Sequence, residues 1–455
     1  MRQRRRCRRE RLLAKGPLIR RTCAAARWLC IGLSSQACSL VNAFDACDEQ
    51  PSERRVNERG DLTEFVAGPG AAAGLDTGRL LVSWAAQSED EATSEVRYGM
   101  YSPTGEKVSI CSGSAVEKTF NAEGAYAMLP SASVADLDHF GDHAAAALAW
   151  TERLTTDTNE RRSRVLFLDA AGCGVGSPGS FSPFSPEFEN VGNVSIGWSA
   201  RAHTLLAIGN STSHVVMAHV TQLDWGPTTE LGGSELVYRT AFAIGPQGDA
   251  LVAWSHAPSL SRATANRVSF GAALLDEQLE KRKTFEVTTP IEYEYGSSVV
   301  PPHVGVAAGK DRFAITVDGA TQDHGAPTAY VLEVDGDGHT LAPARKLELG
   351  DRNCCATPLY LADGSLFVSW LSAEAQGSVG LLVGPDGRER FTSVGCKEGP
   401  FVLGSRNPDF IGQPSPLLAG DTLHVLHTAT TPTDPLSTAV LDWFMPAAQL
   451  WPVAP

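Results

Sequence analysis

A short apolar run that ends in tryptophan recurs along this chain of 455 residues. The clear copies are LLVSW at 80–84, AALAW at 146–150, ALVAW at 250–254 and LFVSW at 366–370. Degenerate copies stand between and after them: TLLAI at 204–208, RFAITV at 312–317 and LHVLH at 423–427. The run returns every 46 to 66 residues. Such self-similarity predicts a repeat architecture, in which one unit cannot bury its hydrophobic faces alone and neighbouring units must stack.

The residues around each run extend the repeat to a unit of four strands. An apolar stretch and a turn rich in Gly, Asp or Pro precede the run, and a polar loop of variable sequence follows it. A second apolar stretch, another turn and a weaker strand complete the unit, which reads as an antiparallel meander. Seven such units centre on Trp84, Trp150, Ile208, Trp254, Thr316, Trp370 and His427. We therefore predict an all-β fold, a β-propeller of seven four-stranded blades, with six or eight blades as alternatives.

A pair of β-sandwiches also has short strands and Gly- or Pro-rich turns. Sandwich strands would not keep one order of long and short connections through seven cycles, so the propeller is preferred. The pattern G-x-hhVaW, followed by a strand and a D-x-x-G turn, resembles the repeats of secreted and lipoprotein propellers of bacteria over most of residues 62–455. The resemblance implies the fold and not a function. The sequence lacks the Asp-box turns that mark sialidases.

The N-terminal segment differs from the rest of the chain. Residues 1–27 hold eleven Arg or Lys and one acidic residue, and a short apolar segment follows at 28–37. A basic region followed by a short apolar region predicts an export signal, because a membrane-spanning helix needs about 20 apolar residues. We expect the signal at 1–37, a tether at 38–61 and one propeller domain at 62–455. The segment ending in Cys38 resembles a lipoprotein signal, which implies lipidation of Cys38; an ordinary cleaved signal is the alternative.

The net charge of the chain limits the kinds of partner that it can bind. Without residues 1–27 the chain keeps 27 basic and 51 acidic residues, a net charge of −24. Such a surface repels phosphate backbones and anionic lipids. We therefore expect no nucleic-acid partner, no membrane contact except through a lipid anchor, and an extracytoplasmic location: the periplasm, the outer membrane surface or the medium.

Six cysteines remain beyond the signal region, and none forms a CxxC pair, so the sequence does not support a tetrahedral zinc site. Cys111 and Cys173 occupy similar places in adjacent units. Cys354, Cys355 and Cys396 belong to the sixth unit. In an oxidising compartment we expect disulfides between Cys111 and Cys173, and between Cys396 and either Cys354 or Cys355; free thiols are the alternative.

No catalytic, metal or cofactor motif stands out. The loop at 136–142 carries three Asp residues but lacks the spacing of a calcium loop. Glu292, Tyr293 and Tyr295 lie in a long connection and are candidate binding residues, since aromatic faces suit sugars and peptides. An ordinary edge strand has the same alternation of residues.

These observations favour an exported, non-enzymatic module that binds a protein or a glycan, or acts as a scaffold, at the cell envelope. A divergent carbohydrate-active enzyme, a glycosidase or a lyase, is the alternative; a glycosidase would need two carboxylates about 5–10 Å apart. We expect the ligand on the rim formed by the long loops after the tryptophan runs, because function concentrates on variable loops. Besides 292–295, that rim carries Glu89, Asp90, Glu152, Arg153, Arg161, Arg162, His256 and Asp323.

Overall fold

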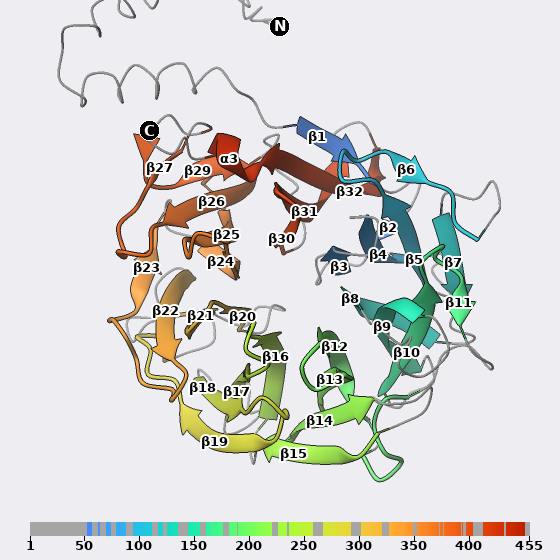
Figure 1. Cartoon of the computed structure of the whole chain (residues 1–455), viewed down its shortest axis with the longest axis horizontal. Helices are drawn as coiled ribbons and strands as arrows, with labels where there is room; N and C mark the ends of the chain where they lie inside the picture. The colour runs from blue at the N-terminus through green and yellow to red at the C-terminus, as the bar shows by residue number, and fades with distance from the viewer. Residues whose placement is uncertain are drawn as a thin grey trace, which may run out of the picture.

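The computed structural model describes residues 52–56, 62–63, 70–73, 79–87, 94–111, 117–121, 125–134, 144–154, 161–175, 182–188, 190–220, 226–233, 236–257, 267–292, 302–320, 327–348, 353–372, 374–375, 377–392, 394, 397–403, 413–431 and 434–450. Within these ranges the chain forms a β-propeller of seven blades around a central axis, each blade built on four antiparallel strands (Figure 1). The predicted fold and blade number are confirmed. No described helix is both long enough and apolar enough to cross a membrane.

The strands of each blade follow one another outward from the axis. The innermost strands are β3 (Gly70–Ala73), β8 (Ala125–Val134), β12 (Gly192–Ser199), β16 (Leu236–Ile244), β20 (Val304–Ala308), β24 (Asn353–Tyr360) and β30 (Ser415–Ala419). The second strands are β4 (Leu80–Gln87), β9 (Ala144–Leu154), β13 (Thr204–Asn210), β17 (Ala250–Ala257), β21 (Arg312–Gly319), β25 (Leu366–Ser372) and β31 (Thr422–Thr431). All seven residues on which the predicted units centre lie on these second strands.

The third strands are β5 (Ser94–Tyr101), β10 (Arg161–Asp169), β14 (Val215–Val220), β18 (Ser269–Leu275), β22 (Thr328–Asp335), β26 (Gly377–Val383) and β32 (Asp434–Pro446). The outermost strands are β6 (Lys107–Val108), β11 (Gly174–Val175), β15 (Thr228–Gly232), β19 (Lys281–Glu286), β23 (Arg345–Leu347), β29 (Phe401–Leu403) and β1 (Ser52–Arg55). Short additions are β2 (Leu62–Thr63) and β7 (Glu117–Asn121) in the first blade, the pair β27 (Phe391–Thr392) and β28 (Lys397–Glu398), and the helix α3 (Ala447–Leu450).

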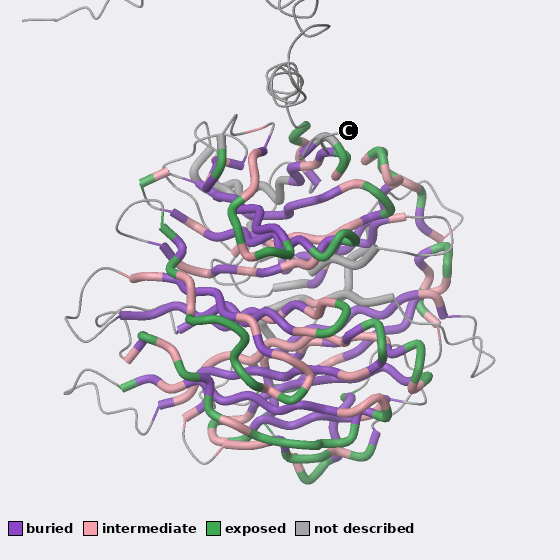
Figure 2. Tube along the Cα trace, turned by 60° about the vertical axis from the view of Figure 1, so that its left-hand side comes forward, coloured by how far each residue is buried: buried purple, intermediate pink, exposed green. Residues whose placement is uncertain are grey.

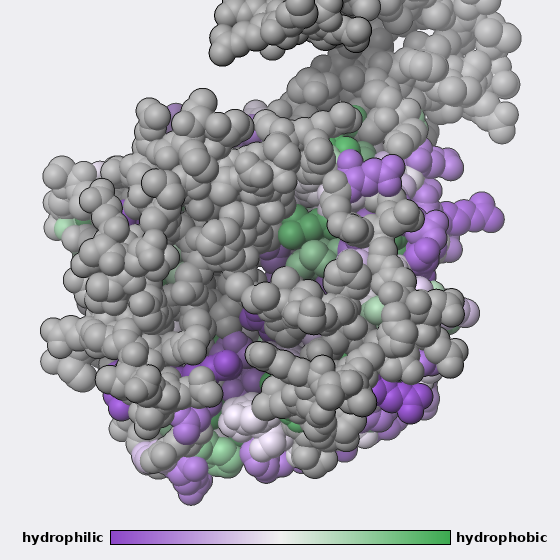
Figure 3. Space-filling view, turned by 180° about the vertical axis from the view of Figure 1, so that it is seen from behind, coloured by the Kyte–Doolittle hydropathy of each residue, from purple (hydrophilic) through white to green (hydrophobic). Residues whose placement is uncertain are grey.

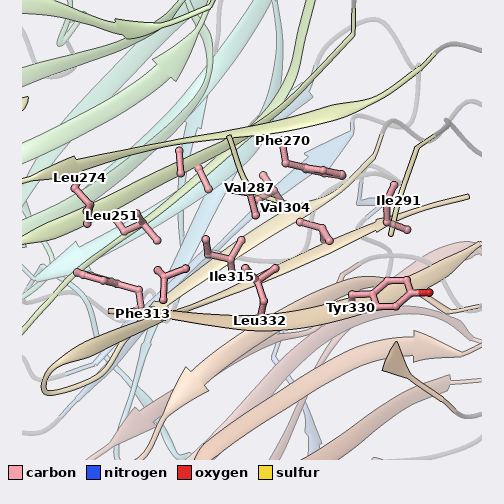
Figure 4. Packing of buried hydrophobic residues seen from close by; sticks show 14 of the residues in the cluster. Leu251, Phe270, Leu274, Val287, Ile291, Val304, Phe313, Ile315, Tyr330 and Leu332 are labelled. Carbon is pink, nitrogen blue, oxygen red and sulfur yellow. The ribbon is translucent and has the colours of Figure 1, made fainter. Parts of the chain in front are cut away.

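Burial explains why the repeated run reads as continuous apolar sequence and does not alternate. Every residue of β13 is buried, because neighbouring blades cover both faces of the middle strands. Between the fourth and fifth blades, Leu251 and Phe270 pack against Phe313 and Ile315 (Figure 4). The outermost β19 is mostly exposed and carries charged residues. The tube in Figure 2 shows buried segments along the middle of the sheets and exposed segments at their outer edges.

The indole ring of Trp254 needs a small residue on the adjacent strand. Trp254 pairs in register with Gly271 of β18, and a Cβ atom at Gly271 would lie 2.4 Å from Trp254 Cε2. The glycine therefore leaves the space in which the indole ring packs within the blade.

The ring closes between the two ends of the described chain. β1 pairs antiparallel with β32 and completes the last blade, with Arg54 opposite Asp442. Arg54 donates to Asp442 Oδ2 from Nε at 2.9 Å and from Nη2 at 2.6 Å. The fully buried Asp442 also contacts Nδ1 of the buried His424, at 3.0 Å from Oδ2. Residues 52–56, which lie within the predicted tether, therefore belong to the propeller.

The same N-terminal strand contacts the first blade. The hydroxyl of Tyr101, on β5, donates to the carbonyl of Val56 at 3.0 Å. The Arg54 guanidinium carbon lies 5.1 Å from the ring centroid of Tyr101 and 5.0 Å from that of Phe444. Arg54 thus connects the first and last blades at the point where the ring closes.

We predict that Asp442→Ala lowers the free energy of unfolding by about 3–5 kcal/mol, because it leaves Arg54 without its partner in a mostly buried site. The matched control is Asp337→Ala, which removes an exposed ion pair with Arg282 and is expected to cost below about 1 kcal/mol. Urea unfolding curves measure both. Equal costs for the two variants would show that ring closure does not depend on this pair.

Candidate functional site

A group of polar side chains lies where first strands begin and second strands end. We call Arg239, His303, Asp318, Cys354 and Cys355 the rim cluster. Arg239 is on β16, His303 directly precedes β20, Asp318 is near the end of β21, and the two cysteines are on β24. In an antiparallel meander the start of one strand and the end of the next share an edge, so the fourth, fifth and sixth blades bring these residues to one rim of the propeller. Seen from behind, hydrophilic residues lie below the hollow near the centre of the molecule and hydrophobic residues lie above it (Figure 3).

Asp318 occupies a position that has a structural role in several blades. One or two residues after the centre of a predicted unit, a polar side chain on the second strand bonds to the first strand of the following blade, or to the segment just before it. Thr151 accepts from Val194 N, Asn210 donates to Val237 O, and Ser255 donates to Pro302 O. Asp318 accepts from Cys355 N at Oδ2, at 2.6 Å. The fifth blade therefore uses a carboxylate where the other three use neutral groups.

Burial changes the proton affinity of that carboxylate. Asp318 is 5% exposed, and Oδ1 also accepts the His303 backbone N–H at 2.5 Å. Burial raises the pKa of Asp318 to about 6, although the two backbone hydrogen bonds and the Arg239 charge act in the opposite direction. A carboxyl group with a pKa of about 6 exchanges a proton near neutral pH.

Arg239 supplies a positive charge to the rim cluster. Among the described residues, its guanidinium forms no hydrogen bond and no ion pair. Burial lowers the pKa of Arg239, and the neighbouring Arg161 lowers it further, but an arginine stays protonated in a protein. The guanidinium groups of Arg239 and Arg161 are near each other, and Asp318 is the one carboxylate in the described part of the chain that acts on Arg239. The rim cluster therefore favours binding of an anion.

His303 is neutral in this environment. Burial and the nearby Arg239 charge lower its pKa to about 3, with the Gln413 side chain acting in the opposite direction. Gln413, which precedes the seventh blade, also donates from Nε2 to Thr357 Oγ1 at 3.1 Å. Within the described ranges, the buried Nδ1 of His303 has no hydrogen-bond partner. A buried polar atom without a partner is costly, which is consistent with a site that a ligand completes.

A metal ion does not suit the donors of the rim cluster as they stand. Donor atoms of Asp318, Cys354 and Cys355 lie within 4.8 Å of one another. The two sulfur atoms are 2.7 Å apart, whereas two sulfurs on one tetrahedral zinc, each at about 2.3 Å, lie about 3.8 Å apart. Both Asp318 oxygens already accept backbone hydrogen bonds, and Arg239 repels a cation.

The predicted binding residues Glu292, Tyr293 and Tyr295 are described only in part, since both tyrosines lie outside the described residues. Glu292 lines an open cleft of about 370 Å³ at the outer part of the fourth blade. The backbone N–H of Glu292 donates to Ala320 O at 3.0 Å. Ala320 is two residues beyond Asp318, so Glu292 lies on the same rim. The cleft is lined by Arg267, Val268, Ser269, Phe270, Glu286, Val287, Thr288, Thr289, Ile291 and Glu292.

The other residues predicted on the rim divide into three groups. Glu89, Asp90 and Asp323 lie outside the described residues, as does the side chain of Arg153. Glu152 pairs with Arg164, His256 contacts Glu286, and Arg162 is exposed at the start of β10. Arg161 is the member of this set whose charge acts on the rim cluster, through Arg239.

The cysteines bear on the predicted disulfides. Cys38 and Cys396 lie outside the described residues, and Cys111, Cys173, Cys354 and Cys355 are not joined to one another by disulfides. Cys111 nevertheless packs against the turn that carries Cys173 in the next blade: its N–H donates to Ala171 O at 3.0 Å and its thiol to Gly172 O at 3.4 Å. The pairing of Cys111 with Cys173 stays a prediction, as does a bond from Cys396.

Sequence reasoning did not single out Arg239, His303 or Asp318 as site residues. One signal was available. Arg239 stands inside the otherwise mostly apolar strand LVYRTAFAI, and Asp318 directly follows the apolar run of its unit. A charged residue beside the core positions of a repeat marks a place where its unit differs from other units.

Comparisons with known proteins support the fold. No family model matches the chain, and no curated protein is significantly similar to it in sequence. Among solved structures, it is similar to the polysaccharide lyase Uly1, with a TM-score of 0.51 and 8% identity over 87% of this chain and all of that one. It is also similar to a protein of unknown function from Dyadobacter fermentans (TM-score 0.47, 11% identity, 87% and 99% covered). A third is the β-propeller domain of the Trilobed protease from Pyrococcus furiosus (0.42, 8%, 84% and 94%). At such identities the likeness shows the fold alone.

We predict that His303→Asn reduces the loss of stability on acidification. A histidine whose pKa falls from 6.5 to about 3 on folding contributes stability that is present above pH 6.5 and lost as pH falls toward 3. Between pH 6.5 and 4.5 this loss amounts to between about 1 and 3 kcal/mol, which the variant avoids. Asp318 acts in the opposite direction, because its raised pKa favours the folded state at low pH.

The measurement is the free energy of unfolding in urea at several pH values. The exposed His203, on the turn between β12 and β13, provides the matched control His203→Asn, for which the pH dependence should equal that of the wild type. An unchanged pH dependence in His303→Asn would contradict a buried, neutral His303.

Proposed function

We propose that this protein is an exported β-propeller that binds an acidic glycan, one bearing uronate or sialate carboxylates, at the rim cluster. The observation that carries the proposal is the guanidinium of Arg239, which has no partner among the described residues and lies beside Arg161 and the buried His303. Arginine binds carboxylates through paired, charge-assisted hydrogen bonds. A cation that has no partner among the described residues is suited to receive such a group.

The rest of the rim fits a sugar ligand. The cleft at Glu292 is connected to the rim cluster by the hydrogen bond from Glu292 N to Ala320 O, and it is lined by Phe270 together with polar groups. The strongly acidic body of the protein, at −24 outside residues 1–27, leaves a local positive site as the place where an anion can bind. The fold shared with a polysaccharide lyase makes acidic polysaccharides a reasonable first set of probes.

Catalysis on the same ligand is the second candidate function. Asp318 has a pKa of about 6 and lies beside Arg239, so the site combines a proton acceptor with a cation that can neutralise a uronate carboxylate. These are two of the groups that β-elimination from a uronate requires, the third being a proton donor to the leaving oxygen. Arg239 is the charged side chain among the described residues that acts on the pKa of Asp318, which favours a lyase over a glycosidase with two carboxylates.

The location of the protein remains as the sequence predicts it. The basic segment and short apolar segment at 1–37 support export, and the last residue of the segment LSSQAC, Cys38, is the candidate for lipidation. β1 begins at Ser52, so removal of a signal ending at residue 37 would leave the strand that closes the ring. A protein partner, rather than a glycan, is the outcome to consider if no acidic glycan binds.

We predict that wild-type protein binds at least one member of a panel of alginate, pectate, glycosaminoglycan and sialylated oligosaccharides. Arg239→Ala should weaken that binding by about 10- to 100-fold, since a charge-assisted contact contributes about 1.5–3 kcal/mol. The control is Arg201→Ala, which removes an exposed arginine paired with Glu277 on the opposite rim and should leave affinity unchanged. Isothermal titration measures affinity, and ultraviolet absorbance of unsaturated products reports lyase turnover in the same samples. Equal affinity in wild type and Arg239→Ala would refute the site.

We further predict that affinity for the acidic ligand rises as pH falls through about 6, provided that the ligand stays ionised. Protonation of Asp318 removes a negative charge that acts on Arg239 and leaves the cation to the ligand. Asp318→Asn should abolish this pH dependence and hold affinity near its low-pH value. Titrations at pH 5 and 7.5 test it, with urea unfolding of the variant as a check on folding. A variant that keeps the wild-type pH dependence would assign the titration to another group.

A further inference from the structure

Two adjacent thiols meet at the rim, and neither the fold nor the proposed glycan site explains them. Cys354 and Cys355 lie on β24 at a bulge, where the register against β25 shifts between Cys354 and Thr357. Their Sγ atoms are 2.7 Å apart, with Cys355 donating toward Cys354. Non-bonded heavy atoms pack at about 3.5–4.0 Å, so these sulfurs are closer than packing alone accounts for.

The backbone is also unusual at this point. Cys355 has a φ of +61°, a left-handed conformation that is uncommon for residues other than glycine and asparagine. Such strain persists where the surrounding structure holds it, and it concentrates at functional sites. Here the Cys355 N–H donates to Asp318 Oδ2, and the next residue, Ala356, accepts from Thr316 Oγ1 at 2.5 Å. The neighbouring blade therefore fixes the conformation that brings the two sulfurs together.

We propose that Cys354 and Cys355 form a reversible disulfide between adjacent residues, and that this bond is a redox-sensitive element of the rim. Adjacent Cα atoms are about 3.8 Å apart, below the usual range of about 4.4–6.8 Å in disulfides, so the bond is more easily reduced than an ordinary structural one. Both cysteines are partly exposed, which gives a small thiol or disulfide access to them. The hydrogen bond with Cys354, burial and the Asp318 charge raise the pKa of Cys355, so a neutral disulfide also removes the cost of a thiolate there.

The oxidant is a small-molecule disulfide of the glutathione class. The thiolate of Cys354 attacks one sulfur of the oxidant, forming a mixed disulfide and releasing one thiolate. Cys355 then loses its proton and attacks Cys354 Sγ, releasing the second thiol. Two protein thiols and one small disulfide thus become one protein disulfide and two small thiols.

The pair is connected to the proposed ligand site, and this part of the inference rests on the proposed function. Formation of the disulfide constrains the Cys355 backbone, whose N–H donates to Asp318. Because Asp318 lies beside Arg239, oxidised and reduced protein should present the anion with different arrangements of charge. We expect glycan affinity to differ by several-fold between the two redox states.

The test maps the bond without use of a ligand. The full chain is equilibrated with glutathione redox buffers, acid-quenched, denatured and alkylated, and the peptide holding residues 354–355 is weighed. We expect that peptide to be two hydrogens lighter and unalkylated under oxidising buffers, and doubly alkylated under reducing ones. The midpoint should fall within the range that glutathione buffers cover. Cys355→Ser should leave Cys354 alkylated or glutathionylated at every ratio, while Cys111→Ser should leave the 354–355 peptide as in the wild type.

Three outcomes overturn the proposal. The peptide is doubly alkylated at all ratios, or it is joined to the peptide of Cys396, or both thiols are protected by a stoichiometric metal that a chelator releases. Affinity is then measured on the two mapped redox states. A mapped disulfide with no difference in glycan affinity refutes the connection to the ligand site. A mapped disulfide in a protein that binds no acidic glycan refutes the proposed function and leaves the redox element standing.

Discussion

A blade of this propeller buries both of its faces only because a neighbouring blade covers each of them. The apolar middle strands, of which β13 is buried throughout, would expose that surface at any open end of the row of blades. The ring must therefore close, and it closes through β1, which completes the last blade, and through Arg54. Arg54 joins Asp442 in the last blade and lies over Tyr101 in the first. Closure in turn fixes the innermost strands around the axis.

The hydrogen bonds between blades explain why a chemical site forms at one rim. Polar side chains on the second strands, one or two residues after the centres of the predicted units, bond to the next blade: Thr151, Asn210, Ser255 and Asp318. In the fifth blade this group is an acid, and it is buried close to Arg239. The same residue thus contributes to packing between blades and carries a proton affinity shifted toward neutral pH. A small change in a structural position is enough to give a propeller a place for chemistry.

The rim cluster depends on residues that are far apart in sequence. Arg239 and Asp318 are 79 positions apart, and Cys355 follows 37 positions after Asp318. The pKa of about 3 for His303 results from the burial of its ring and from Arg239, both of which arise only when adjacent blades dock. The proposed ligand site and the proposed disulfide share this origin: the fifth blade holds the Cys355 backbone while the fourth contributes the cation.

The sequence by itself determined the seven blades, because the continuous apolar run ending in tryptophan records burial on both faces of a strand, and each copy marks a second strand. It also placed the long connections, and with them Arg161, at one rim, since strands that alternate in direction send alternate connections to opposite ends. Tertiary structure alone decided that residues 52–56 belong to the last blade, because their partner strand β32 lies nearly 400 residues later and β1 has no apolar run of its own. It also decided which single residues meet. Arg239, His303 and Asp318 carry no local motif, and their shared chemistry comes from the docking of blades, which brings them together and removes water from around them.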